Sequence, residues 1–149
     1  MRFTVIFAFV LLTLALGCTR KVSPEKTPLP TDPTMKMVAF DEVIGLARGE
    51  TAKVEKTAGG IKFLSVASDN RCPKDVNCIT EGEAFVMVSL AGGNAQRVRI
   101  DVDPKRMSRM VMEGATVEFI GLEPYPQARV KVDPEDIRLR VRITKSAKM

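Results

Sequence analysis

The sequence predicts an all-β domain, namely an antiparallel β-sandwich of the Ig-like kind with about seven or eight short strands. From residue 35 onward apolar residues alternate mainly with period two, and no long helical stripe interrupts them. Turn-forming Gly, Pro, Asn and Asp residues separate these runs at short intervals. A small closed barrel is the alternative, because the same pattern suits a sheet that joins its own edges.

Eight strands are predicted in chain order, most of them bounded by turn signals. Gly59-Gly60 precedes a run rich in β-branched and aromatic residues. Gly92-Gly93-Asn94 is typical of a hairpin turn, and Pro124-Tyr125-Pro126 forces an extended or turning connection. Residues 105–113 fit either a short helical turn or an irregular crossover. The predicted strands cover residues 39–47, 51–56, 61–67, 83–91, 96–102, 115–122, 128–132 and 136–144.

Three of these strands indicate which of their side chains face the core. Residues 83–91 carry apolar side chains on both faces, as expected of a central strand that is partly covered on both sides. Residues 96–102 and 136–144 alternate more cleanly, which is typical of one buried and one solvated face. Their expected inward residues are Val98, Ile100, Val102, Ile137, Leu139, Val141 and Ile143, and their outward basic residues are Arg97, Arg99, Arg138, Arg140 and Arg142.

The N-terminus has the features of a secretory leader. A positive start is followed by residues 3–16, which are apolar except for two threonines. This run has the length of a signal-peptide core and is short of the roughly 20 residues of a membrane span. Because it ends in Leu14-Ala15-Leu16-Gly17-Cys18, it resembles the bacterial lipoprotein signal, which implies that residues 1–17 are removed and that Cys18 is lipidated. An ordinary cleaved signal or an uncleaved anchor is the alternative.

Residues 18–34 are predicted to form a proline-rich tether that precedes a domain at residues 35–149. Four prolines among Ser, Thr, Lys and Glu block helix and central strand and favour an extended spacer. At about 3.1 Å per residue such a spacer reaches up to ~50 Å from the bilayer. Thr19 stands where many lipoproteins retained at the inner membrane carry aspartate. The resemblance therefore implies a lipid anchor in the cell envelope, at the outer membrane and facing the periplasm in a Gram-negative host.

The composition excludes several kinds of active site. The chain has no histidine, so Ser-His-Asp and Cys-His catalysis and His-ligated zinc are ruled out. The formal net charge is +5, but basic and acidic residues are interspersed, which is weak support for nucleic acid binding. We therefore predict a protein that is not an enzyme, holds no cofactor and binds no nucleic acid.

Cys72 and Cys78 are predicted to form a disulfide. If Cys18 carries lipid, these two cysteines remain as a pair in an oxidising compartment. Five residues separate them, whereas a redox pair usually has two, and no histidine is present to complete a zinc site. We interpret the bridge as a structural staple. A compatible alternative is that the staple presents Arg71, Lys74 and Asp75 rigidly to a partner.

The segment around these cysteines resembles a group of bacterial lipoproteins that have a lipobox and no assigned activity. The matching residues are Asp69-Asn70-Arg71-Cys72-Pro73, Val76-Asn77-Cys78 and Gly82-Glu83-Ala84, which precede a strand. Leu122-Glu123-Pro124-Tyr125-Pro126 and the last predicted strand also match, so the resemblance covers about residues 40–144. Members often carry an aromatic residue soon after the second cysteine, where this chain has Ile79-Thr80-Glu81. The resemblance implies a secreted β domain.

Two further hypotheses concern surface charge and metals. The first hypothesis is a basic face that binds an anionic envelope component and is formed by Arg138, Arg140 and Arg142. Arg97 and Arg99 would join this face if their strands are neighbours. The alternative is that these arginines simply solvate the outer face of the sheet. Methionine thioethers suit copper(I), and carboxylates suit calcium. The residues concerned are Met35, Met37, Met107, Met110 and Met112 for copper, and Asp101, Asp103, Asp133, Glu135 and Asp136 for calcium.

These features predict a lipid-anchored cell-envelope protein with a non-catalytic binding or structural β domain. Its expected partners are the membrane, through the N-terminal lipid, and an envelope protein or an anionic envelope component. A periplasmic carrier of a metal or small ligand is the alternative function, and a redox enzyme comes third.

Overall fold

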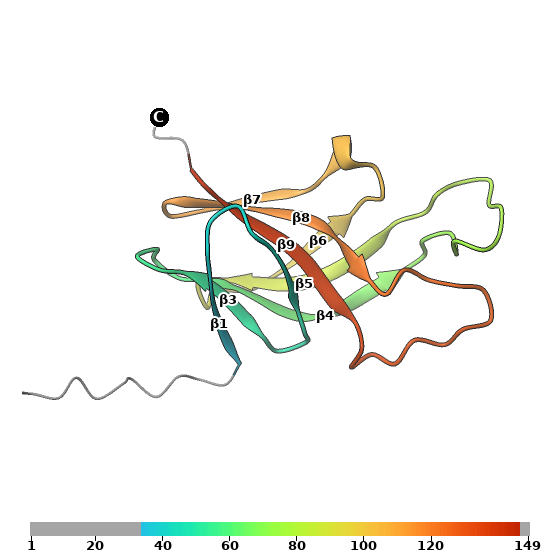
Figure 1. Cartoon of the computed structure of the whole chain (residues 1–149), viewed down its shortest axis with the longest axis horizontal. Helices are drawn as coiled ribbons and strands as arrows, with labels where there is room; N and C mark the ends of the chain where they lie inside the picture. The colour runs from blue at the N-terminus through green and yellow to red at the C-terminus, as the bar shows by residue number, and fades with distance from the viewer. Residues whose placement is uncertain (1–33, 147–149) are drawn as a thin grey trace, which may run out of the picture. The chain divides into compact units, whose positions relative to one another are not determined.

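The computed structural model describes residues 34–146, which form two packed β-sheets (Figure 1). The predicted signal peptide, Cys18 and nearly all of the predicted tether lie outside these residues. No α-helix occurs between residues 34 and 146, and that part of the chain contains no helix long and apolar enough to cross a membrane.

The first sheet has five strands in the order β1-β3-β4-β5-β6, and the second has four in the order β2-β9-β8-β7. A short 3-10 helix, η1 (Pro104–Arg106), leads from the first sheet to the second. The strands of the first sheet are β1 (Met35–Val38), β3 (Thr51–Val54), β4 (Ile61–Asp69), β5 (Ala84–Leu90) and β6 (Ala95–Ile100). Those of the second are β2 (Val43–Leu46), β7 (Arg109–Met112), β8 (Ala115–Glu123) and β9 (Arg138–Lys145).

This architecture confirms the predicted β-sandwich, and the two sheets do not close into the alternative barrel. The described residues contain nine strands, which is more than the seven or eight expected. The additional strands are short: β1 lies before the first predicted strand, and β7 lies in the ambiguous segment 105–113. The pairing is antiparallel except between β1 and β3, which run parallel in register from Met35 opposite Thr51.

The core lies between the sheets and consists mostly of the side chains that the alternation predicts to face inward. Phe63 of β4 and Phe119 of β8 are its largest buried members, one from each sheet. Val98, Ile100, Leu139, Val141 and Ile143 are buried as predicted, while Val102 and Ile137 are partly buried. Full burial of one such side chain contributes about 1.5–3 kcal/mol, so this layer supplies most of the stability of the sandwich.

The strand predicted at residues 128–132 is wrong, because these residues lie in the loop between β8 and β9. Arg129 has a φ of +64°, in the left-handed region, which interrupts an extended run. The Val130 amide donates to the Gln127 carbonyl at 3.3 Å and closes a turn. The Ala128 amide donates to the Asp75 carboxylate at 2.7 Å instead of to a neighbouring strand.

The basic face that would combine Arg97 and Arg99 with the arginines of β9 does not form. Arg97 and Arg99 lie on β6 at one edge of the five-stranded sheet, whereas β9 lies inside the four-stranded sheet. Alternating arginines on two strands look alike in sequence, and only the pairing of the strands decides whether they share a surface.

Candidate binding end of the sandwich

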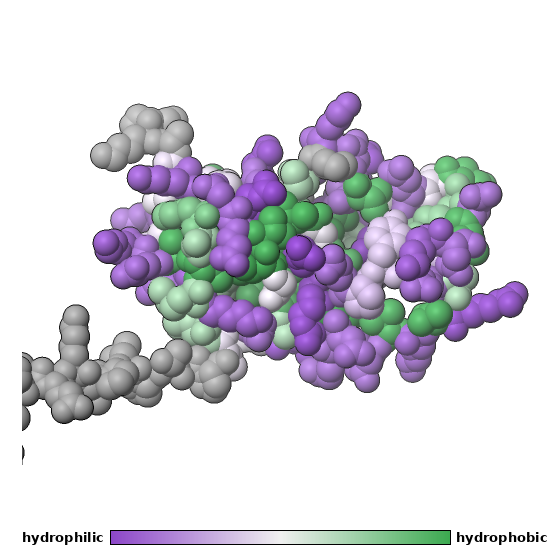
Figure 2. Space-filling model, in the orientation of Figure 1, coloured by the Kyte–Doolittle hydropathy of each residue, from purple (hydrophilic) through white to green (hydrophobic). Residues whose placement is uncertain are grey.

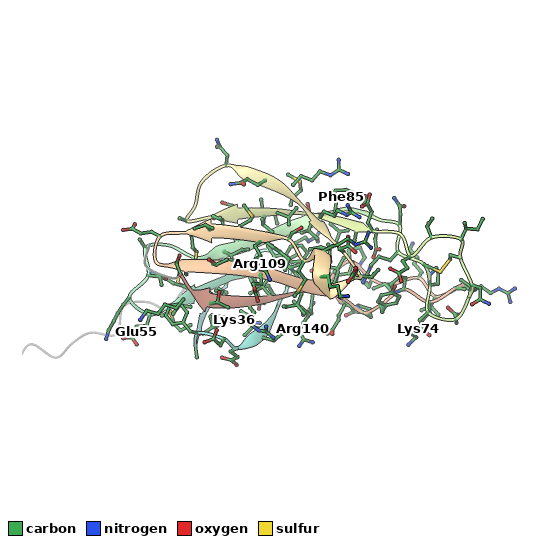
Figure 3. All side chains as sticks on the ribbon, turned by 90° about the horizontal axis from the view of Figure 1, so that it is seen from above. Lys36, Glu55, Lys74, Phe85, Arg109 and Arg140 are labelled. Atoms are coloured by element: carbon green, nitrogen blue, oxygen red, sulfur yellow. A yellow bond between two sulfur atoms is a disulfide. The ribbon has the colours of Figure 1, made fainter. Side chains whose placement is uncertain are left out.

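Two long loops protrude from one end of the sandwich, and we call them together the stapled end. The stapled loop (residues 70–83) joins β4 to β5, and the second loop (residues 124–137) joins β8 to β9. Both lie at the end of the domain away from the start of β1 (Figure 1). The predicted disulfide is confirmed: Cys72 and Cys78 are bonded within the stapled loop, with their Cα atoms 5.9 Å apart (Figure 3).

The base of the stapled loop continues the pairing of β4 with β5. The Asn70 amide donates to the Glu83 carbonyl at 2.9 Å, and the Cys72 amide donates to the Glu81 carbonyl at 2.8 Å. Gly82 has a φ of +70°, and a Cβ atom built there would lie 1.9 Å from the Asn70 carbonyl oxygen. The close approach of the two arms therefore requires glycine at this position.

Arg71 fastens the stapled loop to the second loop from inside. Its side chain is only 3% exposed, and its Nε and Nη2 atoms donate to the two carboxylate oxygens of Asp69 at 2.8 and 2.6 Å. Its Nη1 donates to the Leu122 carbonyl at 2.6 Å and its Nη2 to the Pro124 carbonyl at 3.5 Å. The guanidinium also lies 4.9 Å from the centre of the Tyr125 ring, within the range of cation–π attraction.

The burial of Arg71 changes the interpretation of this residue. Its donors are directed to groups within the protein, so in this arrangement it holds the two loops rather than contacting a partner. Burial of Asp69 raises the pKa of its carboxyl group, but the hydrogen bonds and the charge of Arg71 outweigh that effect and hold the pKa below its ordinary value. The predicted binding role of Arg71 stays untested.

Backbone contacts join the two loops nearer their tips. The Lys74 amide donates to the Pro126 carbonyl at 3.0 Å. The Asp75 carboxylate accepts the Ala128 amide at 2.7 Å, across 53 residues of chain. The two loops are thus bonded to each other at their bases and along their length, which limits their independent motion.

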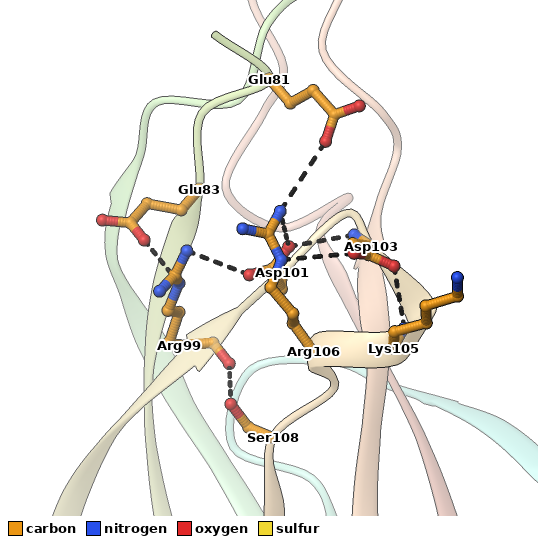
Figure 4. A network of polar contacts seen from close by, with 8 residues as sticks. All are labelled: Glu81, Glu83, Arg99, Asp101, Asp103, Lys105, Arg106 and Ser108. Atoms are coloured by element: carbon orange, nitrogen blue, oxygen red, sulfur yellow. Dashed lines mark hydrogen bonds and ion pairs between the residues drawn. The ribbon is translucent and has the colours of Figure 1, made fainter.

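A polar network lies between the base of the stapled loop and the segment that follows β6 (Figure 4). Arg99 lies between two carboxylates, with its Nε 2.5 Å from Glu83 and its Nη2 3.0 Å from Asp101. Arg106 of η1 approaches Asp101 at 3.2 Å and Glu81 at 4.0 Å. The network ties η1 and the end of β6 to the stapled loop.

Asp101 is the centre of this network. The sequence suggests it only as a calcium ligand and does not predict this structural role. Its side chain is 2% exposed. A hydrogen bond from the Asp103 amide lowers the pKa of Asp101, and the charges of Arg106 and Arg99 lower it further against the opposing effect of burial. The spacing of Arg99 and Asp101, two residues apart along an extended segment, is the signal that places them on one face.

Three cavities of about 460, 250 and 480 Å³ hollow the base of the stapled end. The first and third share Glu81 as a lining residue, and the second and third share Val102 and Tyr125, so that the cavities adjoin. Their sizes approach or fall within the range of about 300–1,000 Å³ that is typical of ligand sites. Many of their charged lining groups, however, already pair with one another in the contacts given above.

The tips of the two loops expose apolar side chains. Ile79 is fully exposed, Val76 is 44% exposed and Val130 is 57% exposed. Lys74, the second predicted contact residue, is also exposed in the stapled loop and is labelled in Figure 3. Lys74 makes no ion pair among residues 34–146, in contrast to Arg71.

The arginines of β9 lie on the outer face of the four-stranded sheet among acidic residues. Arg140 Nη1 is 2.8 Å from Glu123, and Arg142 Nη1 is 3.5 Å from Glu118. Arg138 donates to the Glu135 and Ile137 carbonyls. The pairing of Arg140 and Arg142 with glutamates on β8 reduces the positive potential that the sequence pattern suggests for this face.

The residues predicted to hold metals are dispersed. Met35 and Met37 lie on β1 in the five-stranded sheet, whereas Met110 and Met112 lie on β7 in the four-stranded sheet, with Met112 buried in the core. Within residues 34–146 there is no group of three or more carboxylate or cysteine side chains placed to hold a metal ion. The carrier function therefore gains no ligand set from the described part of the chain.

Comparison with known proteins adds no family to this picture. The chain matches no family model, no curated protein and no solved structure.

Proposed function

We propose that this chain is a lipid-anchored protein of the cell envelope whose β-sandwich is a non-catalytic binding module, with the stapled end as its binding surface. The anchor rests on the apolar leader that ends at Gly17-Cys18 and on the proline-rich spacer that follows it. The outer membrane is the expected location in a host with two membranes.

The observation that carries the binding role is the construction of the stapled end. A disulfide, a buried arginine and two inter-loop hydrogen bonds restrain loops whose tips nevertheless leave Ile79, Val76 and Val130 in solvent. Rigid loops lose little conformational entropy on binding, and exposed aliphatic side chains gain free energy when a partner covers them. Pre-organised loops on a rigid scaffold are also where binding residues are commonly found.

The anchor is tested by the mass and the membrane partition of the mature protein. We expect the N-terminal peptide from the membrane fraction to carry acyl chains at Cys18, and a Cys18→Ser variant to be released from that fraction by a high-salt wash that leaves the parent protein in place. An unmodified Cys18 in the mature protein would contradict the anchor.

The binding surface is tested by site-specific photo-cross-linking in intact cells. A photoreactive amino acid replaces Ile79 at the tip of the stapled loop, and the matched control replaces Val111, an exposed residue on the edge strand β7. We expect a defined adduct from position 79 and none from position 111. Equal cross-linking from the two positions would contradict a binding role of the stapled end.

A further inference from the structure

The tips of the stapled end combine two kinds of exposed side chain. The aliphatic side chains of Val76, Ile79 and Val130 lie on the same two loops as three exposed cations, Lys74, Arg129 and Lys131. None of these cations makes an ion pair within the described part of the chain. Figure 2 shows hydrophobic surface at the end where the loops protrude, with strongly hydrophilic side chains beside it.

Basic residues outnumber acidic ones in the parts of the two loops that carry these side chains. Residues 34–146 contain 18 basic and 16 acidic residues. Of these, residues 72–80 and 124–132 contribute three basic residues and one acidic residue, which leaves 15 of each sign elsewhere. The one acidic residue, Asp75, already accepts the Ala128 amide. Residues 72–80 and 124–132 are therefore basic, although the two loops as a whole, which also include Arg71, Glu81, Glu83, Asp133, Glu135 and Asp136, contain four basic and six acidic residues.

The shape of the tips distinguishes between classes of partner. Two of the cavities described above lie at the base of the stapled end, the third also reaches Lys74 and Val76, and Ile79 lines none of them. A projecting apolar side chain needs either a matching hollow in a protein or a deformable apolar medium. Flanking cations favour the second, because the interface of an anionic bilayer offers acyl chains to the aliphatic groups and phosphates to the cations.

We infer that the stapled end binds the surface of an anionic phospholipid bilayer, with Ile79 and Val76 in the interfacial region and the three cations near the phosphates. This inference deepens the proposed function and rests on it for the stapled end as the binding surface. Within the described domain, the stapled end lies away from the start of β1 (Figure 1).

Each part of the tip has an expected effect on binding. Full burial of an isoleucine side chain corresponds to roughly a 10- to 100-fold gain in affinity, so we expect Ile79→Ser to weaken vesicle binding about ten-fold for partial insertion. Each cation near an anionic surface contributes about five-fold. Lys74→Gln combined with Lys131→Gln should therefore weaken binding about 25-fold. Added salt should weaken it as well, since it screens these charges.

The test uses a tryptophan reporter, because the natural chain contains no tryptophan. The protein is the full mature chain with Cys18→Ser and its disulfide intact, so that no acyl chain confers binding. Ile79→Trp places the reporter at the tip, and Val111→Trp places it on β7 as the control. Circular dichroism verifies that both variants are folded before vesicles of phosphatidylglycerol and phosphatidylethanolamine are added.

We expect the emission of the Ile79→Trp variant to shift to the blue with these vesicles and to be quenched by lipids brominated in their acyl chains. Vesicles of phosphatidylcholine alone should have little effect, and the Val111→Trp variant should not respond. An unchanged emission of the Ile79→Trp variant, or an equal shift of both variants, would overturn the inference.

A charge-matched control separates the tip from general attraction to anionic vesicles. Lys62→Gln with Lys145→Gln removes two exposed cations from β4 and β9, and binding should remain within a few-fold of the parent. An equal loss from this pair and from the tip pair would overturn the inference. If Cys18 is acylated but the photo-cross-link from position 79 joins a protein, the lipid-surface inference fails and the proposed function stands.

Discussion

Replacement of Arg71 tests whether this buried arginine holds the stapled end together. In Arg71→Ala the carboxylate of Asp69 loses the guanidinium and keeps the hydrogen bond from the residue 71 backbone amide, at 3.2 Å in the parent, while the Leu122 and Pro124 carbonyls lose a donor. Removal of one partner from a buried ion pair costs about 3–5 kcal/mol, and a hydrogen bond to a charged group is worth about 1.5–3 kcal/mol. Because the Asp69 side chain is 27% exposed, water partly solvates the stranded charge, and we expect a loss at the low end, about 3 kcal/mol.

The assay is urea unfolding followed by circular dichroism and by the fluorescence of Tyr125, the only tyrosine, which lies against Arg71. For a domain of this size a loss of 3 kcal/mol lowers Tm by about 12 °C. Arg71→Lys should lie between the parent and Arg71→Ala, since lysine keeps the charge but cannot bond Asp69 and the two carbonyls with one planar group.

Arg97→Ala is the matched control for this prediction. Arg97 is exposed and lies 4.0 Å from the centre of the Phe85 ring, a contact worth about 0.5–1 kcal/mol. If Arg71→Ala lost no more stability than Arg97→Ala, the guanidinium would not be what joins the two loops, and the account of the stapled end would be refuted.

Three further predictions concern the same end of the domain. Gly82→Ala should lower the thermal stability of the domain far more than Gly114→Ala. Both glycines have a φ near +70°, but only at Gly82 does the added Cβ meet a carbonyl oxygen, at 1.9 Å. Equal losses of stability would contradict the close approach of the two loop arms. Cys72→Ser with Cys78→Ser should cost about 2 kcal/mol in urea unfolding, as expected for a small closed loop, and no change would contradict a stabilising staple. Because the pKa of Asp69 is lower in the folded protein than its ordinary value near 3.8, its ionised carboxylate stabilises the fold at a pH above 3.8, and this stabilisation is lost as the pH falls through the folded pKa. Asp69→Asn should therefore flatten the dependence of the unfolding free energy on pH below about 4. An unchanged slope would contradict the assignment.

The sequence predicts best the strands that lie between a core and solvent. β6 and β9 alternate cleanly because one face of each packs on the opposite sheet, and their inward residues are buried as expected. β5 carries apolar groups on both faces, and it lies between β4 and β6 as a central strand should. In these segments the local pattern and the tertiary environment agree, so that periodicity alone is sufficient.

Prediction fails where the decisive contacts are distant in sequence. The buried guanidinium of Arg71 bonds the carbonyls of Leu122 and Pro124, which lie 51 and 53 residues away, and the local sequence does not predict these contacts. Residues 128–132 alternate like a strand, but Asp75 accepts the Ala128 amide and Arg129 turns the chain. β1 is four residues long and pairs in parallel with β3, so neither its length nor its alternation distinguishes it from the preceding segment.

The distribution of ion pairs determines which of the predicted contact residues are available to a partner. Arg140 and Arg142 are paired with glutamates on β8, so an anion that approaches this sheet face must compete with a neighbouring carboxylate for each of them. Lys74 has no such competitor among the described residues, and an incoming phosphate needs only to displace water. Exposed ion pairs are worth at most about 1 kcal/mol, so the competition does not exclude binding at the sheet face, but it removes most of the electrostatic advantage there. Lys74 is therefore more readily available to an incoming anion than Arg140 or Arg142.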